Sequence, residues 1–285
     1  MINYAHRGAS EYAPENTLSA FYLGLLQGAN GIETDVQQSK DGALVLFHDD
    51  DLMRAASVPG AVRDYTLAEL QSFRVTGNCT TGFFDRIVTL REFLEKFTPY
   101  PLHFAIELKT ESVARPVIDL LHEFDAAPRA TVTRFSFDGL RDAKQYDPAI
   151  RVGLLTPGDG CDRIAELQSI GGEEMAPEAR CLTPDSVRTL RQAGLGVRAW
   201  GVTDIAQMRR MCALGGDGMT VNFADRLTQY LAAAARCREV RPCCCTQTGF
   251  RTPPARPKAP PTATATRRRI SAKRSRHAEP SGAPR

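Results

Sequence analysis

Short apolar segments alternate with amphipathic segments along the first 235 residues of the chain. Apolar runs of about four to eight residues predict buried strands, and apolar residues spaced three and four apart predict helices between them. We expect strands at 2–5, 32–36, 103–108, 131–135, 151–155, 174–176, 196–202 and 218–221. The helices expected between and after them lie at 18–26, 90–97, 113–124, 139–146, 162–170, 184–193, 205–214 and 224–235.

The alternation is interrupted once, after the second strand. Lys40-Asp41-Gly42 is a turn signal, so the apolar segment 43–47 predicts a hairpin-like extension. From about residue 50 to 86 the periodicity lapses and Pro59-Gly60 and Gly77-Asn78 interrupt the chain. We expect an insertion there with one short helix at 67–73.

Eight strand-then-helix units predict an α/β protein with a (β/α)8 TIM barrel. No Gly-x-Gly-x-x-Gly motif follows a predicted strand, which disfavours a dinucleotide-binding fold. The barrel is expected to span 1–236, with the insertion at about 50–86. Residues 237–285 are rich in Pro, Arg and Thr and cannot bury enough apolar surface to fold, so a basic, disordered tail is expected.

The charge of the chain is concentrated in this tail. From residue 236 onward there are 13 Arg or Lys against two Glu, a balance of +11 that leaves −8 for the rest of a chain whose net charge is +3. The basic character therefore does not describe the barrel, and no nucleic acid partner is expected.

Neither a membrane segment nor a zinc site is predicted. No apolar run approaches the roughly 18 residues that span a bilayer, and the first residues lack the features of a signal peptide. A cytoplasmic location is therefore expected. Half of the eight cysteines are scattered singly, and Cys237 and Cys243-Cys244-Cys245 do not have the spacing of a zinc site.

Four polar clusters lie at the ends of predicted apolar segments, where a barrel of this kind builds its sites. They are His6-Arg7-Gly8, Glu33-Thr34-Asp35, His48-Asp49 and Glu107-Leu108-Lys109. Glu33 and Asp35 are two apart on a strand, so their side chains leave the same face. That face is expected to be the barrel interior, because Ile32 and Val36 on the other face would point outward to the helices. Turning both carboxylates to water would also flip these apolar residues.

Together with Glu107 from the next barrel strand, these carboxylates form an oxygen ligand set suited to Mg²⁺ or Ca²⁺. His6 and His48, expected on neighbouring barrel strands, are candidates for general acid and base. Arg7 and Lys109 offer positive charge for a phosphate, or could form salt bridges with the site carboxylates. This combination predicts phosphoryl transfer on a metal-bound phosphate ester.

The ordered motifs resemble those of the glycerophosphodiester phosphodiesterases over about residues 3 to 231. They are 5–8 (AHRG), 14–17 (PENT), 32–36 (IETDV), 41–42 (DG), 47–49 (FHD), 107–109 (ELK), 136–137 (SF), 199–203 (AWGVT) and 216–218 (GDG). The resemblance implies a TIM barrel with an insertion after the His-Asp motif. It also implies that Glu33, Asp35 and Glu107 bind the divalent cation and that His6 and His48 are the acid–base pair.

The same resemblance implies that Arg7 and Lys109 hold the phosphate and that Trp200 lines the alcohol side of the pocket. It implies an attack by a neighbouring glycerol hydroxyl on phosphorus, which expels the alcohol, and opening of the cyclic phosphate by water. The last strand departs from the family pattern, since 219–224 reads Met-Thr-Val-Asn-Phe-Ala. Trp200 could instead be a core residue.

The predicted function is therefore metal-dependent hydrolysis of a small glycerophosphodiester to glycerol 3-phosphate and an alcohol. One alternative is lysophospholipase D-like or phospholipase D-like activity on lipids, for which Phe83-Phe84 in the insertion is the candidate membrane contact. Another is an inactive barrel that acts as a binding module. The residues leave open the metal, the head group, the order of the two histidines and the oligomeric state.

Overall fold

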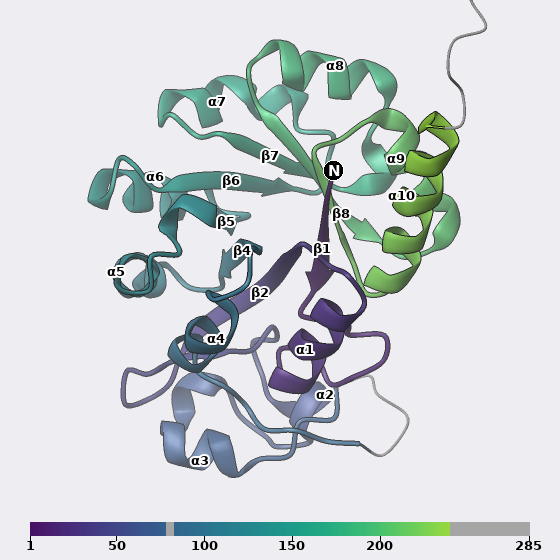
Figure 1. Cartoon of the computed structure of the whole chain (residues 1–285). Coiled ribbons are helices and arrows are strands. Elements are labelled where there is room, and N and C mark those ends of the chain that lie inside the picture. Colours follow the sequence, from purple (N-terminus) through teal and green to yellow (C-terminus); the bar gives the residue numbers. More distant parts are fainter. Residues whose placement is uncertain (78–82, 240–285) are drawn as a thin grey trace, which may run out of the picture. The chain divides into compact units, whose positions relative to one another are not determined.

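The structure, a computed structural model, describes residues 1–77 and 83–239. Within these residues, eight parallel strands close into a barrel, because β1 pairs with both β9 and β2 (Figure 1). The predicted (β/α)8 class is confirmed. The strands are β1 (Ile2–His6), β2 (Gly31–Gln38), β3 (Leu44–Leu46), β4 (His103–Leu108), β5 (Ala130–Arg134), β6 (Arg151–Thr156), β7 (Glu174–Pro177), β8 (Gly196–Val202) and β9 (Gly218–Val221).

Helices surround the ring of strands in the order that the alternation predicts (Figure 1). They are α1 (Leu18–Leu26), α2 (Met53–Ala56), α3 (Leu67–Ser72), α4 (Leu90–Phe97), α5 (Ala114–Glu123), α6 (Phe137–Tyr146), α7 (Ile164–Ser169), α8 (Pro184–Gln192), α9 (Ile205–Leu214) and α10 (Ala224–Glu239). Several begin at a threonine cap. Thr89 accepts a hydrogen bond from the backbone of Glu92, whose carboxylate bonds back to Thr89, and this capping box fixes the start of α4.

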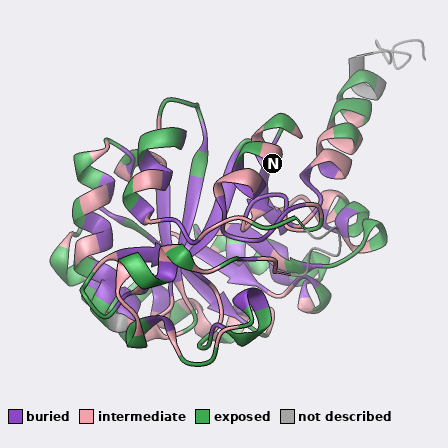
Figure 2. Cartoon of the chain, turned by 90° about the horizontal axis from the view of Figure 1, so that it is seen from below, coloured by how far each residue is buried: buried purple, intermediate pink, exposed green. Residues whose placement is uncertain are grey.

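The main hydrophobic core lies between the barrel and its helices. Figure 2 shows buried strands inside and exposed residues on the outer faces of the helices. Ile32 and Val36 of β2 belong to this core together with Phe104 and Ile106 of β4. Since side chains alternate along a strand, Glu33 and Asp35 point to the barrel interior, as predicted.

The insertion forms a small unit of its own beside β2. As predicted, β3 pairs antiparallel with β2, with Val36 opposite Leu46. The prediction of one short helix was wrong, because α2 precedes α3 and a 3-10 turn, Val62–Asp64, lies between them. A separate apolar cluster that includes Phe47, Leu52 and Leu70 holds these pieces together. A single helical turn such as α2 is too short to show a periodicity.

The last described helix, α10, runs four residues beyond the predicted end at 235. Most of the predicted tail, residues 240–285, lies outside the described residues. Among the residues that are described, no helix has the length and apolar character needed to cross a membrane.

Candidate active site

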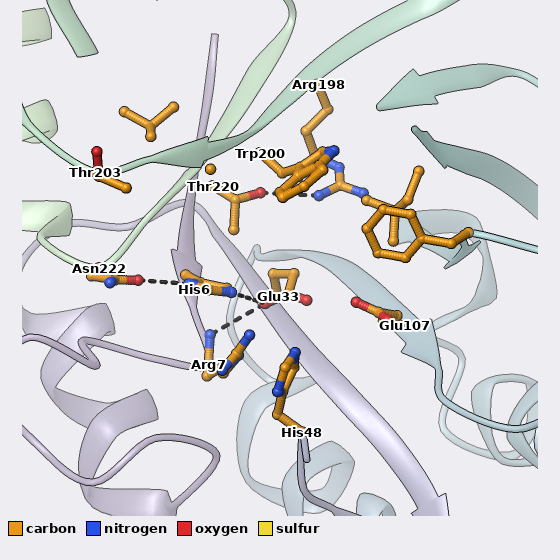
Figure 3. A pocket seen from close by; sticks show the side chains of 14 residues that line it. His6, Arg7, Glu33, His48, Glu107, Arg198, Trp200, Thr203, Thr220 and Asn222 are labelled. Carbon is orange, nitrogen blue, oxygen red and sulfur yellow. Dashed lines mark hydrogen bonds and ion pairs between the residues drawn. The ribbon is translucent and has the colours of Figure 1, made fainter. Parts of the chain in front are cut away.

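One cavity lies at the carboxyl ends of the barrel strands, with a volume of about 210 Å³. Six of the predicted site residues line it: His6, Arg7, Glu33, His48, Glu107 and Trp200. Figure 3 shows His6, Arg7 and His48 around Glu33, with Trp200 and Arg198 at the other end of the view. The other two, Asp35 and Lys109, do not line this cavity but contact residues that do, Arg7 and Glu107.

Glu33, Asp35 and Glu107 form a compact carboxylate cluster. β2 and β4 are paired in register with Asp35 opposite Glu107, and one oxygen from each of the three residues lies within 4.8 Å of the others. Glu33 and Asp35 are buried, while the Glu107 side chain is 12% exposed. Three carboxylates this close repel one another unless positive charge or a proton lies among them.

The charges around the cluster fit a divalent cation. Burial and the neighbouring Asp35 charge raise the pKa of Glu33, and the same two causes raise the pKa of Glu107. Burial would also raise the pKa of Asp35, but Arg7 and Lys109 more than offset it, so that pKa is lowered. Asp35 Oδ1 has no hydrogen-bond partner among the described residues. A Mg²⁺ or Ca²⁺ ion bound by these oxygens would give the buried Asp35 Oδ1 a partner and neutralise the remaining negative charge of the cluster.

His6 ends β1 and is held by Asn222. Its Nδ1 atom lies 2.6 Å from Asn222 Oδ1, and its Nε2 atom lies 3.8 Å from Glu33 Oε2. Loss of hydration of the imidazole, followed by the positive charge of Arg7, lowers the pKa of His6 to about 4, although the hydrogen bond with Asn222 alone would raise it. Gly8 allows the tight turn that follows, since it has a φ of 83° and any Cβ there would lie 2.4 Å from the Ala20 backbone.

His48 reaches the cavity from a different element than predicted. It follows β3, the antiparallel strand outside the ring, so the expectation that both histidines end neighbouring barrel strands was wrong. The hairpin turns the chain back over the end of β2, where Phe47 N donates to Asp35 O at 3.0 Å. His48 Nδ1 lies 2.7 Å from Asp49 Oδ1. This contact favours the tautomer with a proton on Nδ1 and leaves Nε2 for chemistry.

Arg7 and Lys109 both form ion pairs with carboxylates, the alternative that the sequence left open. Arg7 Nη1 donates to Glu15 Oε1 at 2.9 Å, and Arg7 Nε lies 3.2 Å from Asp35 Oδ2. Lys109 Nζ donates to Glu107 Oε1 at 2.8 Å and lies 3.7 Å from Asp35 Oδ1. These pairs place two fixed positive charges next to the carboxylate cluster.

The opposite wall of the cavity is largely apolar. Trp200 donates from Nε1 to Thr156 O at 3.1 Å, and its ring packs edge-to-face on Phe135 with 5.4 Å between centroids. Leu155 and Val202 continue this wall. Beside it, the buried Arg198 donates to Glu174 at 2.8 Å and to Thr220 at 3.0 Å. Trp200 therefore has a structural contact and also faces the cavity.

Several residues of the site were not predicted from the sequence. Asn222 directly follows β9, so the rule that strand ends carry site residues could have identified it. Asn16 and Glu15 lie in a loop instead. Asn16 adopts φ 57° and donates to Asp35 Oδ2 at 2.9 Å, which orients one predicted metal ligand. Their contacts depend on how the loop folds back over β2.

Known proteins share this sequence pattern. The model of the glycerophosphoryl diester phosphodiesterase family matches residues 6–226. The chain belongs to this family. The matched range begins at His6 and includes every predicted site residue, and the resemblance of the motif series is confirmed. The chain is therefore classed with the phosphoric diester hydrolases.

Two relatives show how far the similarity extends. A glycerophosphodiester phosphodiesterase from Caldanaerobacter subterraneus subsp. tengcongensis is 31% identical over 231 residues, which cover 78% of this chain and 94% of the relative. A glycerophosphodiester phosphodiesterase from Bacillus altitudinis is 31% identical over 236 residues, which cover 78% of this chain and 95% of the relative.

Solved structures of the family share the fold. Glycerophosphodiester phosphodiesterase from Agrobacterium tumefaciens aligns with a TM-score of 0.71 at 26% identity, over 79% of this chain and 98% of that one. A phosphodiesterase from Oleispira antarctica, solved in complex with the product sn-glycerol-3-phosphate, aligns with a TM-score of 0.72 at 25% identity, over 80% of this chain and 96% of that one.

Proposed function

We propose that this member of the family hydrolyses glycerophosphodiesters to glycerol 3-phosphate and an alcohol at a divalent cation. The observation that carries the proposal is that one cavity joins a three-carboxylate cluster to two imidazoles, each with Nδ1 in a hydrogen bond. The names of the relatives and the product complex of the Oleispira antarctica phosphodiesterase support the substrate class.

In this proposal Glu33, Asp35 and Glu107 hold Mg²⁺ or Ca²⁺. When bound, such a cation would polarise a phosphoryl oxygen and stabilise the negative charge that develops on it. Arg7 and Lys109, already fixed beside the carboxylates, bind the remaining phosphate charge. Trp200 and Phe135 form the wall against which the leaving alcohol packs.

His6 and His48 then move the protons. His6 is the base, because its lowered pKa keeps the imidazole neutral near pH 7 and its Nδ1 contact with Asn222 leaves Nε2 to accept a proton. It takes the proton of a glycerol hydroxyl as that oxygen bonds to phosphorus. The bond to the head-group oxygen breaks, and His48 protonates that oxygen. Water then opens the cyclic phosphate, with the two roles reversed.

Turnover of defined diesters tests the proposal. Glycerophosphocholine should release glycerol 3-phosphate and choline, EDTA should abolish the release, and Mg²⁺ or Ca²⁺ should restore it. A chain that turns over no diester in the presence of either cation would refute the proposal and favour a binding module.

Lysophospholipid is the second candidate substrate, and one observation favours it. Phe83 and Phe84 of the insertion are 49% and 45% exposed, although Arg74 covers one face of the Phe84 ring. Exposed aromatic residues are suited to a membrane surface. Faster hydrolysis of lysophosphatidylcholine than of glycerophosphocholine, lost in Phe83→Ser with Phe84→Ser, would establish this alternative.

A further inference from the structure

Arg54 connects the insertion to the catalytic cavity. It lies on α2, outside the ring of strands (Figure 1), and has no role in the proposed chemistry. Its guanidinium donates two hydrogen bonds to each of two carboxylates. Nε and Nη2 donate to Asp49 at 2.5 and 3.0 Å, and Nη1 and Nη2 donate to Glu15 at 2.8 and 2.7 Å. Two-point contacts of this kind fix orientation as well as charge.

Each of these carboxylates holds one of the side chains assigned to the reaction. Asp49 accepts from His48 Nδ1 at 2.7 Å, and Glu15 accepts from Arg7 Nη1 at 2.9 Å. Two branches therefore start at Arg54, one ending at an imidazole and the other at a phosphate-binding guanidinium. Arg54 itself is not among the residues that line the cavity.

An ordinary surface salt bridge would not account for this arrangement. The Glu15 side chain is only 7% exposed and that of Asp49 is 21% exposed, whereas the Arg54 side chain is 37% exposed. Arg54 is thus the outer end of a network that becomes more buried toward the site. Without it, Asp49 and Glu15 would each lose a two-point partner and could turn away from His48 and Arg7.

We propose that Arg54 is a positioning residue that fixes His48 through Asp49 and Arg7 through Glu15. The insertion then contributes to the active site, because its Arg54 contacts both of the carboxylates that orient these groups. This inference rests on the proposed function for its kinetic consequences. Its structural consequence, the orientation of the His48 imidazole, does not depend on which substrate is used.

Kinetics of Arg54 variants on metal-loaded protein with glycerophosphocholine test the proposal. Arg54→Ala should lower kcat about 100-fold, as expected when a catalytic group is misplaced by about 1 Å, and should raise KM because Arg7 is loosened. Added guanidinium should restore part of the activity. Arg54→Lys keeps the charge but not the two-point contacts, so its kcat should lie between those of the wild type and Arg54→Ala. This conservative variant keeps the test valid if Arg54→Ala fails to fold.

The branches should separate in single variants. Asp49→Asn should lower mainly kcat and Glu15→Gln should raise mainly KM, and adding Arg54→Ala to either should cost less than in the wild type. Arg86→Ala is the matched control, since Arg86 also makes a two-point pair, with Glu92, and is similarly exposed at 41%. Its kcat and KM should equal those of the wild type.

Nitrogen-15 NMR of the histidines supplies a readout without turnover. The His48 signal should report the Nδ1–H tautomer in the wild type and in Arg86→Ala, and a mixture of tautomers in Arg54→Ala. Wild-type kinetics in Arg54→Ala, or a loss that guanidinium does not rescue with an unchanged His48 signal, would overturn the proposal. If the wild type hydrolyses no glycerophosphodiester, the proposed function fails, and the His48 signal alone decides whether Arg54 positions that residue.

Discussion

Binding of a divalent cation to the carboxylate cluster should release about one proton. Glu33, Asp35 and Glu107 bring three negative charges, and Arg7 and Lys109 are the cations in direct contact with them. With oxygens within 4.8 Å and an effective dielectric constant of about 20, each carboxylate pair costs about 3.5 kcal/mol or more. One uncompensated charge remains, and a proton neutralises it. The raised pKa of Glu33 makes this residue its main carrier.

The cation must displace this proton, so its apparent affinity should rise with pH. Each pH unit below the raised pKa of Glu33 corresponds to about 1.4 kcal/mol, or tenfold in affinity. Titration calorimetry with Ca²⁺ in two buffers of different ionisation enthalpy measures the number of protons released. Glu33→Gln imitates the protonated residue and should bind the cation more weakly, with little dependence on pH. Glu123→Gln, an exposed residue paired with Arg91, is the control.

The same proton links stability to pH. Because the pKa of Glu33 is higher in the folded state than its ordinary value of 4.5, the folded metal-free protein binds more protons than the unfolded chain above that value. The contribution of Glu33 to stability should therefore fall as pH rises from 4.5 to about 8, and Glu33→Gln should remove this contribution. A cation affinity that does not change with pH, with no proton released, would refute the reasoning.

Three further outcomes are expected. Asn222→Ala removes the hydrogen bond to His6 and should lower kcat about tenfold, which corresponds to a hydrogen bond of about 1.4 kcal/mol. Steady-state kinetics measure this loss, and calorimetry should show little change in the thermal midpoint. An unchanged kcat would mean that Asn222 does not orient the base. A p-nitrophenyl leaving group needs no acid, so the release of p-nitrophenol should be largely restored in His48→Ala but not in His6→Ala. The reverse pattern would exchange their roles. Truncation after Glu239 should leave kcat and KM unchanged, and a large loss would place the catalytic domain boundary further along the chain.

The barrel was predictable because short, largely apolar segments alternate regularly with amphipathic helices along the chain. Ile32 and Val36 can pack against the helices only if Glu33 and Asp35 face the barrel interior, so these four residues determine which face of β2 points inward. Seven of the eight predicted site residues were brought together by the barrel itself, the exception being His48, which follows the antiparallel β3. Strand ends in a parallel barrel meet on one face.

The supporting contacts could not be derived in this way. The segment that carries Arg54 has no periodicity, and its helix is four residues long. The position of His48 depends on whether the segment before it joins the ring of strands or folds back as a hairpin. A short apolar run is compatible with both. The contact of Glu15 with Arg7 becomes visible only when the loop that carries Glu15 is placed over the end of the barrel.

Hydrolysis of glycerophosphocholine by the wild type, His6→Ala and His48→Ala, each with saturating Mg²⁺ or Ca²⁺, tests the central claim most directly. Both variants should retain the circular dichroism spectrum and thermal midpoint of the wild type and lose at least about 100-fold in kcat, the usual contribution of a general acid or base. Wild-type turnover in either variant, or in the presence of EDTA, would contradict the account.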